Sequence, residues 1–290
     1  MINHKEILEE AKKSIIDPLG IKLANQVQWW KLKDLTEEIN YEYPVALIGQ
    51  GEPILMLHGF DSSFLEFRRI VPLLSKNNRI IIPDLFGFGF CPRPKNTTYG
   101  KNKIILHLEK IIEHLNTDKP LGLIGASMGG GIAMELARKK PEAINRLLLL
   151  SPAGLTGKPK PIPPFFDQIG VWVLSQPFVR EGLCKQAFAN PKGSVGEAEK
   201  QIASIHLKVP GWEESLASFA RGGGIANCGS PLPKQKLQIL WGEKDRILQG
   251  KVKKDTYKML GPYIEEIKNC GHLPHLDQPK LVARKWDEDA

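Results

Sequence analysis

Hydrophobic residues in this chain form short, nearly continuous runs that alternate with segments of helical periodicity. The apolar runs predict strands at residues 54–57, 79–82, 121–124, 147–150 and 237–241, and a last strand is expected at 264–268. Between them, apolar positions recur every three to four residues, for example at 64–74 and 104–115, which is typical of amphipathic helices. Strands that are apolar throughout and separated by helices predict a parallel sheet with helices on both faces.

The amino-terminal part of the chain has a different pattern. Residues 3–16 predict an amphipathic helix, which Asp17-Pro18 is expected to stop. Residues 27–32 and 41–48 then have the pattern of two arms of an antiparallel pair of strands. Residues 1–26 are therefore expected to form an amphipathic extension that precedes the main sheet.

A long insertion separates the strands expected at 147–150 and 237–241. Residues 154–230 are rich in proline and contain short amphipathic patterns, and they divide the core into 27–153 and 231–290. The insertion carries the aromatic residues Phe165, Phe166, Trp172, Phe178 and Trp212. We expect a helical cap over an active site, with these aromatic side chains as candidates to wall an apolar pocket. An ordinary helical subdomain without a gating role is the alternative.

Composition and charge narrow the class of protein. With 290 residues, of which 42% are hydrophobic and 25% charged, the chain fits an ordinary globular protein, and disorder is excluded. The formal net charge of +8 is scattered along the chain, without a basic block or a nucleic-acid motif. We therefore expect no nucleic-acid binding. Peripheral contact with an acidic membrane surface stays open.

The cysteines and the amino terminus bear on the compartment. The four cysteines, Cys91, Cys184, Cys228 and Cys270, form no C-x-x-C pair and suit neither a zinc site nor a disulfide framework. Free thiols favour a reducing compartment. The amino terminus lacks the apolar core of a secretory signal, and no run approaches the roughly 20 apolar residues of a membrane span. The sequence thus predicts a cytoplasmic protein without a transmembrane segment.

A candidate nucleophile lies in the motif G-x-S-x-G at residues 125–129, with Ser127 at its centre. The motif follows the strand expected at 121–124 and precedes a helical pattern from Gly130. A strand-to-helix turn of this kind presents a serine hydroxyl at the edge of a sheet, and it needs small neighbours because the backbone passes closely. The context therefore favours Ser127 as a catalytic nucleophile.

A serine nucleophile needs a base, and the base needs a carboxylate that orients it. His272 follows the last expected strand, so it should emerge at the same sheet edge as Ser127; His275 is the rival. Asp245 follows the strand at 237–241 and is the expected acid, with Glu243 as the alternative. The resulting chain order is Ser, Asp, His.

Donors for a developing oxyanion are expected next to this triad. Phe60 follows the strand at 54–57, and its backbone N–H is well placed to donate. The second expected donor is the N–H of Met128, directly after the nucleophile. His58 is expected to be a structural loop residue and not a second base.

With these pieces in order, the sequence resembles the α/β-hydrolase superfamily from about residue 29 to the end. The matching motifs are LHGF at 57–60, PDLFGFG at 83–89, GASMGG at 125–130, WGEKDRIL at 241–248 and CGHLPHLDQP at 270–279. The resemblance implies an α/β fold with a mostly parallel eight-stranded sheet, flanking helices and a helical cap. It also implies that neither a metal nor an organic cofactor is used.

Some branches of the superfamily fit less well. Haloalkane dehalogenases and epoxide hydrolases place an aspartate where this chain has Ser127. Meta-cleavage carbon–carbon hydrolases share a similar serine elbow but often carry tryptophan after the catalytic histidine, where this chain has Leu273. Cofactor-free haloperoxidases share a run like 127–131 but usually have proline in the loop of Phe60. Trp29-Trp30-Lys31, GEPILMLHGF at 51–60 and IVPLLSKNNRIIIPDLFGFG at 70–89 look like plant and cyanobacterial chlorophyll-ester hydrolases. This narrower likeness suits a bulky ester under an apolar cap.

The expected function is hydrolysis of a carboxylic ester, an apolar small-molecule substrate held under the helical lid, through an acyl-enzyme formed on Ser127. Carbon–carbon bond hydrolysis by the same triad is one alternative. A ligand-binding receptor on the same scaffold is another, because a fold does not determine function. The substrate and the oligomeric state are left open by the sequence.

Overall fold

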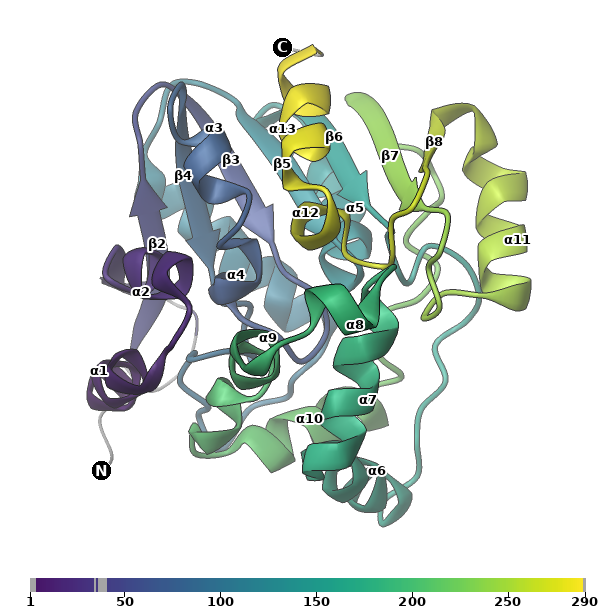
Figure 1. Cartoon of the computed structure of the whole chain (residues 1–290). Coiled ribbons are helices and arrows are strands. Elements are labelled where there is room, and N and C mark those ends of the chain that lie inside the picture. The colour runs from purple at the N-terminus through teal and green to yellow at the C-terminus, as the bar shows by residue number, and fades with distance from the viewer. Residues whose placement is uncertain (1–3, 34, 36–40, 289–290) are drawn as a thin grey trace.

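An eight-stranded sheet forms the centre of the computed structural model, which describes residues 4–33, 35 and 41–288 (Figure 1). Its strand order is β1-β2-β4-β3-β5-β6-β7-β8. The strands are β1 (Val27–Lys31), β2 (Glu42–Ile48), β3 (Glu52–Leu57), β4 (Asn78–Pro83), β5 (Leu121–Ala126), β6 (Ile144–Leu150), β7 (Lys236–Gly242) and β8 (Ile264–Ile267). Each of the six strands predicted at 54–57, 79–82, 121–124, 147–150, 237–241 and 264–268 coincides with one of the strands β3 to β8, with ends shifted by a few residues.

Pairing within the sheet is mostly parallel. The strand pairs β1–β2 and β2–β4 are antiparallel, whereas β4–β3, β3–β5, β5–β6, β6–β7 and β7–β8 are parallel. This confirms the predicted eight-stranded, mostly parallel sheet, including the antiparallel pair at its amino-terminal edge. The carboxyl ends of β3, β5, β7 and β8 therefore meet at one edge of the sheet, where the motifs identified in the sequence follow them.

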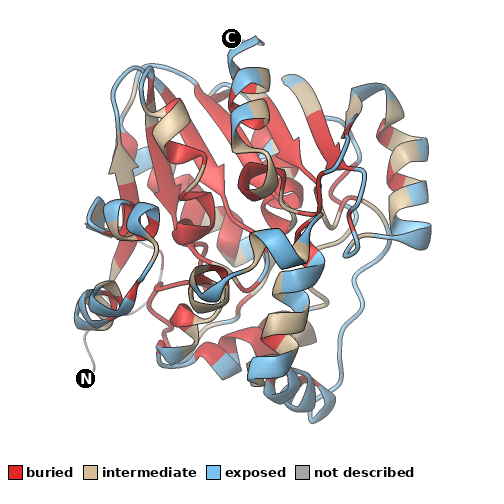
Figure 2. Cartoon of the chain, viewed as in Figure 1, coloured by how far each residue is buried: buried red, intermediate tan, exposed pale blue. Residues whose placement is uncertain are grey.

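Helices cover both faces of the sheet, and the strands between them are buried along most of their length (Figures 1 and 2). The α-helices are α1 (His4–Ser14), α2 (Pro18–Ala24), α3 (Val71–Leu74), α4 (Lys101–Leu115), α5 (Met128–Lys139), α6 (Phe166–Ser175), α7 (Pro177–Ala187), α8 (Pro191–Ser194), α9 (Glu197–Ile202), α10 (Trp212–Arg221), α11 (Gly250–Leu260), α12 (Pro274–Asp277) and α13 (Pro279–Glu288). The 3-10 helices are η1 (Phe64–Phe67), η2 (Ile205–Lys208) and η3 (Gly261–Tyr263).

Strand alternation divides the interior into two hydrophobic cores. On β3, Leu55 and Leu57 pack in the core that contains α4 and α5, whereas Ile54 and Met56 pack in the core that contains α1, α3 and α13. This follows from the two-residue period of a strand, which sends neighbouring side chains to opposite faces. Burial of the sheet on both faces explains why its central stretches, such as residues 54–57, 121–126 and 147–150, are apolar at consecutive positions.

The amino-terminal segment differs from the expectation in one respect. Asp17-Pro18 ends α1 but also begins a second helix, α2, which the sequence pattern did not predict. The Asp17 carboxylate accepts hydrogen bonds from Leu19 N at 2.8 Å and Gly20 N at 3.3 Å. Aspartate at the N-cap followed by proline at the first helical position is a start signal as well as a stop. Asn3, the first residue of the predicted helix, lies outside the described residues.

The single helix predicted at 64–74 is wrong, because the segment forms η1 and α3 with a break between them. Pro72 is the second residue of α3. In a continuous helix its ring would clash with the carbonyl group of residue 68, four positions earlier. The break also lets the buried Arg68 side chain reach Asp17 at 2.6 Å and Glu199 at 3.0 Å.

Helices α6 to α10 form the insertion between β6 and β7. They lie beyond the carboxyl ends of the strands, at the bottom of the view in Figure 1. Arg68 joins this insertion to the amino-terminal segment through its two ion pairs. The division into extension, core and cap stays a prediction, and we call residues 154–230 the cap.

None of the helices in the described part of the chain has the length and apolar character that a membrane span requires.

Candidate active site

Ser127 lies in a tight turn between β5 and α5, at the carboxyl edge of the sheet. Its backbone has φ 49° and ψ −117°, a conformation that residues other than glycine rarely adopt. The Ser127 N–H donates to Leu150 O at 2.9 Å, and its carbonyl accepts from Gly130 N at 2.9 Å and Ala153 N at 2.8 Å. These bonds to three segments hold the strained turn in place.

Two glycines make this turn possible. A Cβ at Gly129 would lie 2.0 Å from the carbonyl oxygen of Leu57, and a Cβ at Gly125 would lie 2.5 Å from the carbonyl oxygen of Gly129. Both distances are far below van der Waals contact. Any larger residue would therefore push the turn away from β3, which explains the G-x-S-x-G spacing.

His272 lies in the loop after β8, and its side chain is buried beside the turn. Its Nε2 is 2.9 Å from Ser127 Oγ. The His272 N–H donates to Ala187 O at 2.8 Å, so the end of α7 in the cap holds this loop. The rival, His275, lies elsewhere: its Nε2 is 3.2 Å from Glu66 Oε1 and its ring centroid is 5.0 Å from that of Phe67.

Asp245 follows β7, and its Oδ2 is 2.9 Å from Nδ1 of His272. Its other oxygen accepts from Ile247 N at 2.8 Å and Leu248 N at 3.0 Å. Burial acts to raise the pKa of this carboxyl, but the hydrogen bonds and the charge interaction with His272 outweigh burial and hold the pKa below its usual value. The alternative, Glu243, is exposed and accepts from Asn269 N at 2.9 Å instead.

The expected oxyanion donors, Phe60 and Met128, belong to segments beside Ser127. Met128 is the first residue of α5, and the first N–H groups of a helix have no acceptor within it. The loop of Phe60 is close, because a Cβ at Gly59 would lie 3.5 Å from Ser127 Cβ. The carboxylate of buried Glu66 accepts from Gly59 N at 3.2 Å, which fixes this loop. The donor role of both groups stays a prediction.

His58 has a structural position next to this loop. It is fully buried, its Nε2 accepts from Leu85 N at 2.9 Å, and its Nδ1 donates to Gly59 O at 2.8 Å. Burial lowers the pKa of His58 to about 4, so the ring stays neutral at physiological pH. Both ring nitrogens are occupied by backbone groups, so the ring ties the Phe60 loop to the loop after β4.

A cavity of about 240 Å³ opens in front of Ser127 and His272, beneath the cap. On the side of the cap, the described residues that line this cavity are Leu174, Arg180, Leu183, Cys184, Ala187 and Ala203. The expectation that the cap aromatics wall this pocket is not met. Phe165, Phe166, Trp172 and Phe178 are exposed, and Trp212 is buried away from the lining. On α6 and α7 the lining residues are aliphatic except for Arg180 and Cys184, and the aromatic residues of these helices are exposed to solvent.

Asp61 connects the Phe60 loop to the cap, and sequence reasoning missed it. It is buried, with a φ of 47°, and its carboxylate contacts three cap residues. His206 Nε2 is 3.0 Å from Oδ1, Trp212 Nε1 donates to the same oxygen at 2.8 Å, and Arg180 donates to Oδ2. Burial acts to raise the pKa of Asp61, but hydrogen bonding to His206 and its charge interactions with His206 and Arg180 outweigh burial and hold it well below its usual value. The cap therefore packs on the Phe60 loop through a buried network around Asp61.

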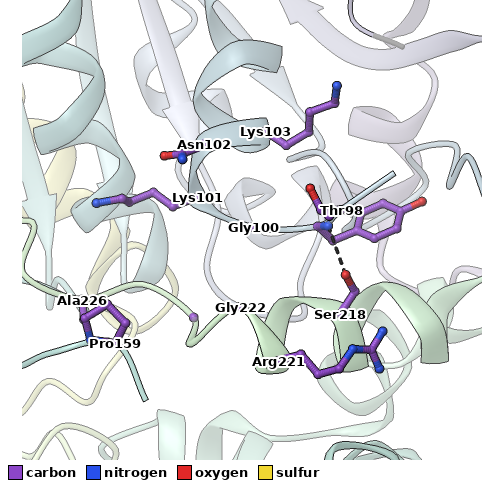
Figure 3. Close-up of a pocket in the computed structure, with 12 residues that line it drawn as sticks. Thr98, Gly100, Lys101, Asn102, Lys103, Pro159, Ser218, Arg221, Gly222 and Ala226 are labelled. Carbon is purple, nitrogen blue, oxygen red and sulfur yellow. Dashed lines mark hydrogen bonds between the residues drawn. The ribbon is translucent and has the colours of Figure 1, made fainter. Parts of the chain in front are cut away.

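A larger cavity, of about 490 Å³, lies between the start of α4 and the end of α10. Figure 3 shows Lys101 and Arg221 extending in different directions from it. Lys101 is 2.6 Å from Glu135, and Arg221 is 2.5 Å from Asp167, so both cations are already paired. Among the described residues that line it, no histidine or carboxylate would activate the Ser218 hydroxyl. The smaller cavity, which is lined by Ser127 and His272, is therefore the candidate active site.

The side chains that could bind a metal ion, and the cysteine thiols, are a further feature of the described ranges 4–33, 35 and 41–288. No group of three or more His, Cys, Asp or Glu side chains there could hold a metal ion. The four cysteines are free, and only Cys184 lines the cavity beneath the cap. Burial raises the pKa of Cys184 to about 11, which disfavours the nucleophilic thiolate at neutral pH.

Comparison with known proteins gives one family and several relatives. A family model described as alpha/beta hydrolase fold matches residues 52–218. The alpha/beta hydrolase domain-containing protein VTE7 of Arabidopsis thaliana is 27% identical over 248 residues, covering 83% of this chain and 74% of that protein. A 2-hydroxymuconate semialdehyde hydrolase of Pseudomonas sp. (strain CF600) is 30% identical over 252 residues, covering 81% of this chain and 85% of that protein.

Solved structures share the same architecture. The structure of the epoxide hydrolase CorEH without ligand has a TM-score of 0.74 at 20% identity, covering 90% of this chain and 97% of that one. At this identity the likeness shows the fold alone. Together with the family match, it confirms the fold that the sequence motifs predicted.

Proposed function

The chain belongs to the α/β-hydrolase family, and we propose that it is a serine hydrolase that cleaves carboxylic esters through an acyl-enzyme. One observation supports this more than any other. Ser127 Oγ, the His272 ring and Asp245 Oδ2 form a hydrogen-bonded chain with two distances of 2.9 Å, at the wall of a cavity. A hydroxyl, an imidazole and a carboxylate in this order are the parts of a nucleophilic triad.

In the proposed reaction, Ser127 Oγ attacks the ester carbonyl carbon while His272 Nε2 takes the hydroxyl proton. The carbonyl electrons move to oxygen, and the N–H groups of Phe60 and Met128 stabilise the oxyanion. Collapse of this intermediate breaks the ester bond, and His272 returns the proton to the leaving alcohol. Water then attacks the acyl carbon, with His272 Nε2 taking a proton from it. The bond between this carbon and Ser127 Oγ breaks, His272 returns the proton to Oγ, and the acid leaves.

A small apolar substrate is part of the proposal. The described cap residues of the cavity lining include Leu174, Leu183 and Ala187, and its one guanidinium, Arg180, is already bound to Asp61. A neutral acyl group leaves that ion pair undisturbed. The cytoplasmic location expected from the sequence is kept here as a prediction.

A second candidate reaction is carbon–carbon bond hydrolysis with the same triad. The relative that favours it is the 2-hydroxymuconate semialdehyde hydrolase, at 30% identity. Comparing turnover of p-nitrophenyl esters with turnover of a chromogenic hydroxy-oxo-dienoate would separate the two reactions. Faster turnover of the dienoate would replace the ester proposal.

Fluorophosphonate labelling tests the proposal directly, because such probes react only with activated serines. We expect the wild-type protein to be labelled and Ser127→Ala to lose both labelling and at least about 10⁴-fold in ester hydrolysis. Ser175→Ala, whose hydroxyl donates to Trp172 O on the outside of α6, serves as the control and should behave as wild type. An unlabelled wild-type protein with an intact fold would favour the receptor alternative.

A further inference from the structure

The outer surface of the cap carries an exposed apolar patch. We define the cap patch as Phe165, Phe166, Ile169, Trp172, Val173 and Phe178, which are 39–75% exposed. Five of them recur along α6 and its N-cap at the spacing of one helical face. Figure 2 shows α6 exposed along most of its length at the extreme end of the cap. A helix face this apolar is normally covered by a partner.

In the chain segment that carries α6, the charges that have no opposite partner are positive. Between residues 157 and 176 the charged residues are Lys158, Lys160 and Asp167. Asp167 is buried and bound to Arg221 at 2.5 Å, so it does not contribute a free negative charge. Both lysines are exposed, and neither forms an ion pair with a carboxylate in the described part of the chain. Aromatic residues beside lysines match the layered chemistry of an anionic lipid surface.

Helices α6 and α7, which carry the cap patch, face the cavity on their other side. Leu174 of α6 and Leu183 of α7 line the space in front of Ser127. The lining also includes Phe60 and Ile247, which are about 40% exposed and form an apolar rim. Helix α6 therefore lies between the cap patch and the cavity, and Leu174 is its contribution to the lining.

We propose that the cap patch docks on a membrane surface containing anionic lipid, and that apolar substrate passes from that surface into the cavity. The second half rests on the proposed function, whereas the docking does not. A second copy of this chain fits the patch less well. A symmetric contact through it would bring Lys158 and Lys160 of both copies into one interface, where like charges repel.

Vesicle flotation of the full chain tests the docking. We expect wild type to float with vesicles of phosphatidylcholine and phosphatidylglycerol, and far less with phosphatidylcholine alone. Combining Phe166→Ser, Trp172→Ser and Phe178→Ser should abolish binding to both. Lys158→Gln with Lys160→Gln should weaken binding to the anionic vesicles by about tenfold or more and remove most of the lipid preference. Ser127→Ala should float like wild type, which separates docking from catalysis.

A matched control removes apolar surface elsewhere. Val252 on α11 and Tyr263 on η3 are 44% and 38% exposed and lie outside the cap. Val252→Ser combined with Tyr263→Ser should leave flotation unchanged, and all these variants except Ser127→Ala should keep fluorophosphonate labelling. Wild type that does not float, or patch substitutions that leave flotation intact, would overturn the proposal. So would a wild-type dimer that the patch substitutions split, without any binding to vesicles.

Discussion

At the scale of single residues, Ser127 combines an unfavourable backbone with a fixed hydrogen-bond geometry. A residue other than glycine at φ 49° and ψ −117° costs about 1–3 kcal/mol, and the turn persists because β6 and α5 bind its N–H and carbonyl groups. Gly125 and Gly129 allow the approach of neighbouring backbone that makes these bonds possible. The strained residue is therefore also the one whose hydroxyl oxygen lies 2.9 Å from Nε2 of His272.

Asp245 is the residue whose role can be tested most sharply, because Glu243 lies two positions away. Asp245→Asn should fold normally and lower kcat/KM for p-nitrophenyl butyrate by about 10⁴-fold, since the amide would hold His272 in the wrong tautomer. Glu243→Gln should change the rate less than about threefold, because its carboxylate faces Asn269 instead. Steady-state kinetics on both purified variants measure the difference. A larger loss in Glu243→Gln would move the acid to that position.

At the scale of elements, residues that come directly after a strand can be placed from the sequence, whereas contacts between distant segments cannot. Asp245 and His272 could be placed because each lies in the short loop that follows a predicted strand. Parallel strands bring such loops to one edge of the sheet. The contacts of Asp61 could not be, because its partners Arg180, His206 and Trp212 come from three separate elements of the cap. Hydrophobic periodicity carries no information on which distant polar groups pair.

Helix α6 is a second example of a feature that the sequence pattern does not predict. Its aromatic residues were candidates for the pocket because they are large and apolar, yet they occupy the outward face of the helix. Residue type alone does not tell a cavity wall from an exposed docking surface, since both are apolar. The rotation of the helix decides it: α6 is turned so that Asp167, paired with Arg221, and Val171 are buried.

Leu174 offers a test of the cap as the specificity element. For wild type, kcat/KM on p-nitrophenyl esters should rise about fourfold per added methylene over the first several carbons and then fall, because each buried methylene contributes about 0.8 kcal/mol. Leu174→Ala should move the optimum to a longer acyl chain, since it enlarges the cavity that this residue lines. Val173→Ala, its outward-facing neighbour, should keep the wild-type optimum. An unchanged optimum in Leu174→Ala would place acyl selection on the sheet loops.

At the scale of the whole molecule, several buried titratable groups make stability depend on pH. Burial lowers the pKa of His107 to about 3 and that of His58 to about 4. Asp84 is opposite in sign, because burial raises its pKa to about 7 despite hydrogen bonds from Phe64 and Phe90. Its contribution to stability is present at low pH and is lost as pH rises towards 7. The total slope is a sum of these contributions, so only a matched difference isolates one group.

His107 on α4 gives that difference, because its buried ring packs against the rings of Tyr43 and Phe86, at centroid distances of 5.2 and 6.1 Å. Its pKa is lower in the folded state than in the unfolded chain, where it is about 6.5. Its stabilising contribution is therefore complete above pH 6.5 and is lost as pH falls towards 3. Between pH 8 and pH 5 this amounts to about 2 kcal/mol of unfolding free energy. Urea unfolding of wild type and His107→Leu at both pH values should show wild type losing about 2 kcal/mol more than the variant. Equal losses in the two proteins would mean that the folded state admits a protonated His107, through local opening or through water reaching its ring.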